Sequence, residues 1–405
     1  MTVLFVGHDW AETHHDLHIE DRDGRCVGKG RVPTGVAGVS QFLEMIAEHD
    51  VDPCDVLIAS ETDRGLFVTA LISAGFSVIA LNPMSTARYR ERQSNSGAKS
   101  DAGDAKTLAA VARLDGHSHR PVFGDSGLVE AIKITARAHH NLIWSRQRQM
   151  NQLRSALREY YPAALEAFPV LIHSDCFGVL AAAPTPTQGR KLTLSQIKSA
   201  IRRGGRKRGF DKRAPQIQQI LRSEQLSAPS QVEKAMGSHV TALITMAIEF
   251  TSQIHRLEAE LGELFDSHQD AEIVRSIPGL GTKLGARVLG EFGDAPDRFI
   301  DARARKNYAG TSPVTRASGR SHVVLARHAR NLRLADTCYQ WAFVTITASP
   351  GARAFYDEKR AKGDSHSKAL RALSNRLVGI LHGCLTNRTR YDEHTAWGHR
   401  QSIAA

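Results

Sequence analysis

The chain has 405 residues, which is enough for two or three domains with cores of their own. It has no apolar run near the ~20 residues that span a bilayer and no recognisable signal peptide, so we expect a cytoplasmic protein without a membrane partner. The net charge of +11 divides into −5 for residues 1–120 and +16 for the remainder. This asymmetry predicts a nucleic-acid partner, with a merely solubilising excess of charge as the alternative. Five scattered cysteines without a C-x-x-C pair predict reduced thiols, not a disulfide framework or a zinc site.

Strands and helices alternate in the first 120 residues. The periodicity predicts strands over 2–9, 15–20, 25–32, 56–61 and 76–81, and helices over 36–47, 66–74 and 101–114. Three strands joined by short turns and followed by α/β alternation predict a ribonuclease-H-like sheet. In that topology the first strand is central and the fourth lies beside it.

Four acidic residues fall at informative places in this order. Asp9 and Glu61 close the first and fourth strands, and Asp101 and Asp104 begin the last helix one turn apart. Unpaired buried charge is costly, so acids at the ends of buried strands need a reason. A pair of divalent metal ions serving phosphoryl transfer is such a reason. The alternatives are a helix cap for Asp101 and a solvated strand end for Asp9.

The histidine-rich stretch 8–18 suggests a different metal site. His14, His15 and His18 do not all share one strand face, however, so no dedicated histidine site is predicted. A dinucleotide site is also excluded, because no G-x-G-x-x-G follows the first strand.

Two long amphipathic helices are predicted in the middle of the chain, from residue 127 and over 240–264. They would form an antiparallel hairpin or an intermolecular coiled coil. An irregular insert near 170–225 is expected between them. Seven of its residues 202–213 are basic, which suits a phosphate-binding loop, although a solvated silent loop has the same composition. The candidate contacts are Arg202, Arg203, Arg206, Lys207 and Arg208.

Two glycine-containing segments follow. Residues 276–282 predict a tight turn followed by a helix, as in a helix-hairpin-helix, in which Gly279 and Gly281 would let backbone N–H groups approach a DNA phosphate; a plain helix–helix turn is the alternative. Residues 308–322 are rich in hydroxyls, glycine and arginine. Ser318 beside Gly319 suggests an exposed nucleophile or a simple turn, and Arg316 and Arg320 could clamp a phosphate.

These motifs resemble those of DEDD-type insertion-sequence transposases, the family numbered one hundred and ten in the insertion-sequence naming, which includes Piv-like invertases. The resemblance covers nearly the whole chain. It rests on Gly7-His8-Asp9, Ser60-Glu61-Thr62 and Lys99 to Ala105 at the N-terminal end. Further along it rests on Ile277 to Gly281, Arg298-Phe299, Tyr308-Ala309-Gly310, Pro313, Ser318-Gly319 and Leu332-Arg333. The chain departs from the pattern at Thr311, where leucine is usual, in lacking a Gly-Asn shortly before Leu332, and in its long insert.

The resemblance implies a RuvC-like domain over 1–120, coiled-coil helices over 121–270 and a mostly helical transposase domain over 271–395. It implies that Asp9, Glu61, Asp101 and Asp104 hold two Mg²⁺ ions and that Ser318 is a nucleophile that links covalently to DNA, with Ser312 and Ser321 as rivals. It further implies a serine recombinase guided by a structured bridge RNA, acting as a homo-oligomer (dimer or tetramer) on DNA in the bacterial nucleoid.

Two other functions stay open at this stage. A RuvC-like nuclease would use the same acids with water as the nucleophile, and Ser318 would then be a bystander. A non-catalytic nucleic-acid-binding factor would keep the basic charge and leave the acids without a role.

Overall fold

The computed structural model describes residues 3–93, 100–119, 121–122, 124–296, 298–319, 321–328 and 330–401. It divides into two compact units. Unit 1 comprises residues 1–126 and 294–298, and unit 2 comprises residues 127–293 and 299–405. Within the described ranges, no helix has both the length and the apolar character needed to cross a membrane. All five cysteines are free thiols.

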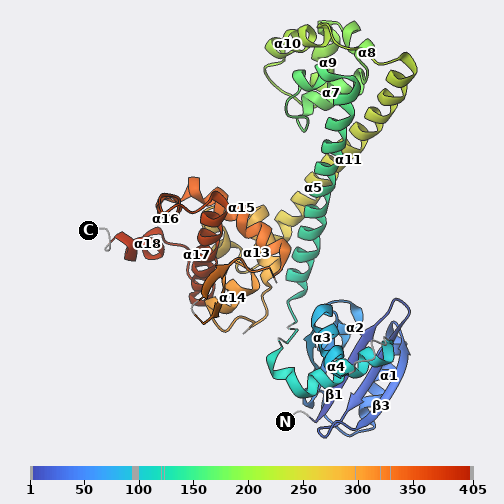
Figure 1. Ribbon diagram of the computed structural model, residues 1–405, viewed down its shortest axis with the longest axis vertical. Helices are drawn as coiled ribbons and strands as arrows, with labels where there is room; N and C mark the ends of the chain where they lie inside the picture. Colours follow the sequence, from blue (N-terminus) through green and yellow to red (C-terminus); the bar gives the residue numbers. More distant parts are fainter. Residues whose placement is uncertain are drawn as a thin grey trace. The chain divides into compact units, whose positions relative to one another are not determined.

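Unit 1 is a five-stranded sheet with helices on its faces (Figure 1). Its strands are β1 (Leu4–Trp10), β2 (His14–Glu20), β3 (Cys26–Pro33), β4 (Val56–Ser60) and β5 (Ser77–Ala80). Its helices are α1 (Val36–Ala47), α2 (Leu66–Ser73), α3 (Pro83–Gln93) and α4 (Asp101–Asp115). The strand order is β3-β2-β1-β4-β5, with β1–β2 and β2–β3 antiparallel and β1–β4 and β4–β5 parallel. The predicted central position of the first strand is confirmed, whereas α3 was not predicted.

The two faces of this sheet are packed differently because side chains alternate along a strand. Val6 and Ile58 point to one face, where they join a core with Phe42 of α1 and Phe67 of α2. Gly7 points to the other face, which is covered by α4. A Cβ atom built on Gly7 would lie 1.7 Å from the carbonyl oxygen of Ala105, so only glycine lets the helix come this close to β1.

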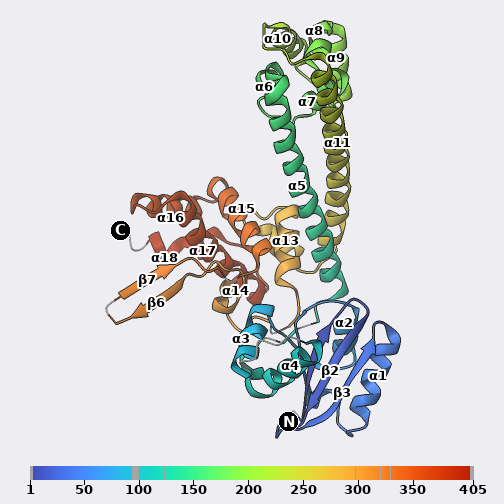
Figure 2. The same cartoon turned by 45° about the vertical axis from the view of Figure 1, so that its right-hand side comes forward.

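Unit 2 is built on two long helices, α5 (Gly127–Tyr160) and α11 (Ser230–Asp266), which run side by side in Figures 1 and 2. His139 lies beside Glu258 and Arg146 beside Thr251, so the helices pair within one chain and are antiparallel. Of the two predicted arrangements, the structure therefore has the hairpin.

Five short helices connect the ends of this hairpin: α6 (Pro162–Ala167), α7 (Ser174–Ala182), α8 (Pro186–Lys191), α9 (Leu194–Arg203) and α10 (Phe210–Arg222). The prediction of an irregular insert near 170–225 is wrong. Its prolines and hydroxyls are helix-start signals: Pro186 opens α8, and Thr193 forms a capping box with Gln196. Ile197 and Ile217 are fully buried in a core shared with Leu153 of α5 and Leu243 of α11.

The remainder of unit 2 is helical except for one β-hairpin. The helices are α12 (Ala271–Ser276), α13 (Thr282–Phe292), α14 (Ala302–Tyr308), α15 (Leu332–Ala348), α16 (Pro350–Ala361), α17 (His366–Asn387) and α18 (Glu393–Gln401). Strands β6 (Val314–Ser318) and β7 (Ser321–Leu325) pair antiparallel and form the hairpin, seen in Figure 2. These two strands were not predicted. The sequence indicated only an exposed nucleophile or a simple turn at Ser318 and Gly319.

Gly7→Ala tests the contact between β1 and α4. The added methyl group has no space beside Ala105, so we expect unit 1 to lose about 3 kcal/mol of stability as α4 is pushed outward. Hydrogen exchange in β1 and α4 of the full chain measures this loss. Gly383→Ala, in α17 with no atom within 4 Å of the new methyl group, is the matched control and should be neutral or stabilising by up to ~1 kcal/mol. Equal protection of β1 and α4 in both variants would contradict the packing argument.

Candidate active site

Asp9 and Glu61 lie at adjacent ends of two parallel strands. Asp9 has the same strand parity as Gly7, so its side chain lies on the face covered by α4. His8 pairs in register with Ser60, which places Glu61 immediately after β4 and beside Asp9. Both acids are partly buried.

Helix α4 supplies the other two predicted acids from its first turn. Ser100 is the N-cap and its Oγ accepts a hydrogen bond from the Gly103 N–H at 3.2 Å, which fixes where the helix begins. The cap is thus Ser100, and Asp101 is free for another role. Asp104 is only 4% exposed, whereas Asp101 is largely exposed.

The four acids are close enough to interact electrostatically. The pKa of Asp9 is raised to about 6, first by burial and then by the negative charges of Glu61, Asp104, Asp101 and Asp16, in that order. Asp16, on β2, is directly opposite Asp9 in the sheet and was not predicted to belong to this cluster.

Two arginines that the sequence analysis missed partly balance this charge. The Arg90 guanidinium of α3 lies 2.5 Å from Asp104 Oδ1. Arg31 of β3 forms a bidentate pair with Asp16 at 3.0 and 3.1 Å and lies 3.7 Å from Asp101. Their positions follow from the pairing of β2 with β3 and from the packing of α3 on α4, and no local sequence motif marks them.

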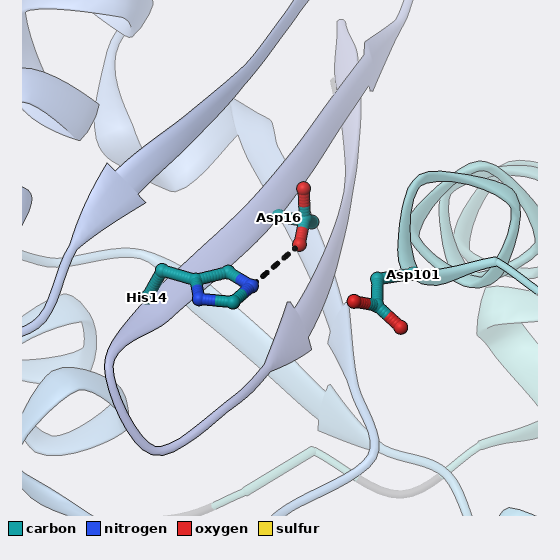
Figure 3. Close-up of side chains that lie close together, drawn as sticks. All are labelled: His14, Asp16 and Asp101. Carbon is teal, nitrogen blue, oxygen red and sulfur yellow. Dashed lines mark ion pairs between the residues drawn. The ribbon is translucent and has the colours of Figure 1, made fainter.

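His14, Asp16 and Asp101 form a second group with the composition of a metal site. Their ligand atoms all lie within 4.8 Å of one another, and His14 Nε2 is 3.4 Å from Asp16 Oδ2 (Figure 3). The sequence predicted that His14, His15 and His18 do not form a metal site together. The structure instead brings one histidine together with two carboxylates. Because Arg31 already engages both oxygens of Asp16, this group is less available to a cation than Asp9 is.

A buried hydrogen-bond network supports the strand end that carries Glu61. His8 Nδ1 lies 3.0 Å from Ser60 Oγ, and His8 Nε2 lies 2.9 Å from His15 Nδ1. Ser60 Oγ also accepts a hydrogen bond from the Thr62 N–H, so this hydroxyl anchors the turn through Glu61. Burial lowers the pKa of His8 to about 3, so the ring is neutral at physiological pH.

The acid cluster suits a hard divalent cation. Five carboxylates face two guanidinium groups, and Asp104 Oδ1 is buried without a hydrogen bond, since Arg90 approaches it in ion-pair geometry only. A carboxylate oxygen in that state gains from metal coordination.

Comparisons with known proteins fit this geometry. Residues 6–162 match a family model described as "Transposase", of the DEDD type, and residues 271–357 match one described as "Transposase IS116/IS110/IS902 family". The chain is 44% identical to the "Mini-circle putative transposase for IS117" of Streptomyces coelicolor, over all of this chain and 99% of that protein. The chain belongs to the IS110 family of transposases. The "Insertion element IS900 uncharacterized 42 kDa protein" of Mycobacterium paratuberculosis is 26% identical, over 97% of this chain and 98% of that protein.

IS110-family membership makes DNA the partner and cutting and rejoining of DNA the activity. The first matched region contains all four predicted acids, and a DEDD-type domain points to use of a divalent metal. The second contains Ser312, Ser318 and Ser321.

The three candidate serines of this IS110-family chain have different surroundings. Ser318 ends β6 next to Gly319, which has a φ of +54°, and Ser321 begins β7 opposite it. Both side chains are exposed, as is Arg316. Ser312 is partly buried before the hairpin. Arg320 lies outside the described residues, so its predicted phosphate contact has no structural account.

A basic cavity of about 560 Å³ lies beside Ser312. Its lining includes Arg327, Lys359, Lys362, Lys368 and Arg371. One acid, Asp364, lines it too and pairs with Lys368. Lys362 pairs with Glu358, and the charges of Arg327, Lys359 and Arg371 make this cavity suited to a nucleic-acid phosphate.

The predicted nucleic-acid-binding residues near 202–208 are only partly free. Arg206 pairs with the buried Asp175 at 2.9 Å, and the Arg202 guanidinium lies over the Phe210 ring at 4.3 Å. Both thus contribute to the fold of the helical insert. Arg203, Lys207 and Arg208 are exposed, and their predicted contact with nucleic acid stays a prediction.

The predicted phosphate-binding glycines also differ from each other. Gly279 has a φ of +83°, and a Cβ there would meet Thr345 and Trp341 of α15. The Trp341 indole N–H and the Thr345 hydroxyl both donate to the Pro278 carbonyl oxygen, so this turn is anchored to α15. Gly281 is exposed with open space at its Cβ position and starts α13. Of the two, Gly281 has the open backbone, and its contact with a phosphate stays a prediction.

Asp9→Asn should stabilise the metal-free protein at neutral pH. The folded-state pKa of about 6 exceeds the ordinary 3.8, so stability falls as pH rises from about 4 through 6 while Asp9 loses its proton. Asparagine removes this loss, which we expect to be on the order of 1 kcal/mol after solvent screening. The measurement is the thermal midpoint of unit 1 between pH 4 and 8, with added Mg²⁺ stabilising the wild type more than the variant. A variant equally or less stable than wild type at pH 8 without metal would contradict this electrostatic account.

Proposed function

We propose that this IS110-family transposase cuts DNA by nucleophilic attack of Ser318, assisted by two Mg²⁺ ions at Asp9, Glu61, Asp101 and Asp104, and is guided to its sites by a bridge RNA. The observation that carries the proposal is the carboxylate cluster that raises the pKa of Asp9 to about 6. Such a concentration of like charge is unfavourable without a cation, and so it is expected only where a cation is used.

The metal ions, when bound, would polarise the scissile phosphate and neutralise its developing charge. The residues of this chain do the rest. Asp9, Glu61, Asp101 and Asp104 would hold the ions. Arg90 restrains the Asp104 carboxylate, and the His8–Ser60 hydrogen bond holds the turn on which Glu61 lies.

The exposure of Ser318 on the β6–β7 hairpin supports its role as the nucleophile. Its Oγ forms a bond to phosphorus while the bond from phosphorus to one sugar oxygen breaks. The serine proton leaves, and the released sugar oxygen takes up a proton. The phosphoserine bond conserves the phosphodiester energy, so attack by another sugar hydroxyl can rejoin the strand. Arg316 would neutralise charge on the phosphate.

The charge distribution supports a second nucleic acid beside the DNA. Residues after 120 carry a net charge of +16, and the basic cavity beside Ser312 adds a phosphate site near the hairpin. A guide RNA would read sequence by base pairing, as in other RNA-guided systems. Because the acids and the serine lie in different compact units, we also propose a dimer or tetramer in which one protomer's acids serve another's serine.

A metal-dependent nuclease is the second candidate. Unit 1 contains the complete acid cluster without any contribution from the serine hairpin. Water activated at that cluster could hydrolyse DNA, and Ser318 would then have no chemical part.

Ser318→Ala separates these functions. Purified protein is incubated with its element ends, RNA from the flanking region and Mg²⁺, and a protein–DNA adduct that survives denaturation is measured. We expect Ser318→Ala to reduce the adduct by at least about three orders of magnitude, since the nucleophilic oxygen is gone. Asp101→Asn should reduce it at least ~100-fold through weaker metal binding.

Ser312→Ala and Ser321→Ala are the matched controls and should retain the adduct. Adduct formation lost only in Ser312→Ala or Ser321→Ala would move the nucleophile to that residue. Cleavage without any adduct, unaffected by Ser318→Ala, would reject the serine mechanism and leave the hydrolytic nuclease.

A further inference from the structure

A second cavity in unit 2, of about 490 Å³, lies where α5, α11, α13 and α15 meet. Figure 2 shows these four helices side by side. Its wall includes Glu258 of α11, Lys283 and Arg287 of α13, Trp144 of α5 and Phe343 of α15. The volume is in the range of small-molecule sites. Neither the acid cluster nor the serine hairpin contributes to it.

Arg287 is the unusual residue of this cavity, because it is a buried cation without a carboxylate partner. The side chain is 6% exposed, and among the described residues no carboxylate lies within ion-pair distance of it. Nη2 donates to His139 Nδ1 at 3.3 Å, while Nε is buried with no hydrogen-bond partner. Burial accordingly lowers the pKa of Arg287. Asp336 and Glu258 act on this guanidinium only from beyond ion-pair distance, so a buried Nε without a partner leaves it able to bind an anion.

The neighbouring arginine on α5 shows what a compensated site looks like in the same region. Arg137 forms two hydrogen bonds with Glu291, at 2.7 and 2.8 Å, one turn further along α13. Arg287 has no such ion pair: the two acids whose charges reach it, Asp336 and Glu258, are paired instead with His140 at 3.1 Å and with Lys283 at 2.5 Å. Glu258 therefore does not supply the missing anion.

The start of α13 adds to the positive potential at the cavity. The helix begins at Thr282, and its N-cap residue Gly281 provides no side-chain cap. Lys283 and Leu284 of the first turn line the cavity, so the partial positive charge of this helix end lies close to it. Lys283 is engaged by Glu258, so the groups that match a phosphate are the buried Arg287 and the uncapped helix N-terminus.

An aromatic surface lies on the opposite side of the same cavity. Phe343 is 57% exposed, and Trp144 is 40% exposed with His140 and Arg333 near its ring. Large apolar side chains exposed next to a cationic cavity are costly in water unless a ligand covers them. The faces of nucleobases are ligands that aromatic side chains stack against without sequence preference.

We propose that this cavity binds one nucleotide, whose phosphate pairs with Arg287 and whose base stacks against Phe343. The proposal rests on the function in DNA cutting and rejoining, and it adds a nucleotide-binding site separate from the acid cluster and the serine. The nucleotide belongs to single-stranded DNA, to single-stranded RNA or to a free mononucleotide, which share the same chemistry.

The test uses the full-length protein and short single strands of DNA or RNA that contain the fluorescent base 2-aminopurine. Stacking of that base on an aromatic ring quenches its fluorescence. We expect the wild type to quench it, Phe343→Leu to abolish quenching and weaken binding at least about fivefold, and Phe343→Trp to restore both. Lys234→Ala, which removes an exposed lysine of α11 away from the cavity, should bind as the wild type does.

Arg287→Met distinguishes a ligand-binding role from a structural one. Removal of a buried charge that forms no ion pair should leave the thermal midpoint unchanged or higher, while affinity and its salt dependence fall. A lowered midpoint with unchanged affinity would assign Arg287 to the fold and overturn the proposal.

The probe that is quenched identifies the source of the nucleotide. Quenching by DNA alone or RNA alone assigns the strand, and AMP binding as tightly as either strand assigns a free nucleotide. Wild-type binding that neither Phe343→Leu nor Arg287→Met weakens would reject this cavity as the site and leave the proposed function intact. A wild type that binds no nucleic acid at all would reject both.

Discussion

The close packing of α4 against β1 is the constraint on which the candidate active site depends. Gly7 leaves room for the carbonyl of Ala105, and this contact fixes the distance between the helix and the central strand. Asp9 is two residues beyond Gly7, and Asp101 and Asp104 begin the helix that packs there. One small residue therefore decides whether carboxylates from distant parts of the chain share one site.

Bringing these acids together has an electrostatic cost that the fold offsets only in part. Within the described part of the chain, Arg90 and Arg31 are the cations that pair with the cluster, and neither forms an ion pair with Asp9. The raised pKa of Asp9 records the imbalance. A site under such repulsion is poorly suited to structural stability and well suited to holding divalent cations, which is the usual compromise between stability and activity.

In unit 2 the charges that the fold offsets only in part are positive. Among its described residues, some basic side chains form ion pairs within the fold, such as Arg206 with Asp175 and Arg137 with Glu291, and others form none, such as Arg287. The net charge from composition includes the paired and the unpaired basic residues alike. Only the second kind provides positive charge for nucleic acid, so the functional charge of the chain is smaller than its formal charge.

The sequence by itself determined the strands of unit 1 and the two long helices, because period-two and helical patterns are local signals. The central first strand with the fourth beside it followed from the order of these elements, and that topology led to the expectation that Asp9, Glu61, Asp101 and Asp104 lie close together. The sequence did not determine the helices of the insert or the β6–β7 hairpin, where short elements look like turns. Arg90, Arg31, Asp16 and the cavity at Arg287 were decided by tertiary structure alone. Their partners come from distant elements, and which charges are compensated depends on how those elements pack rather than on any spacing along the chain.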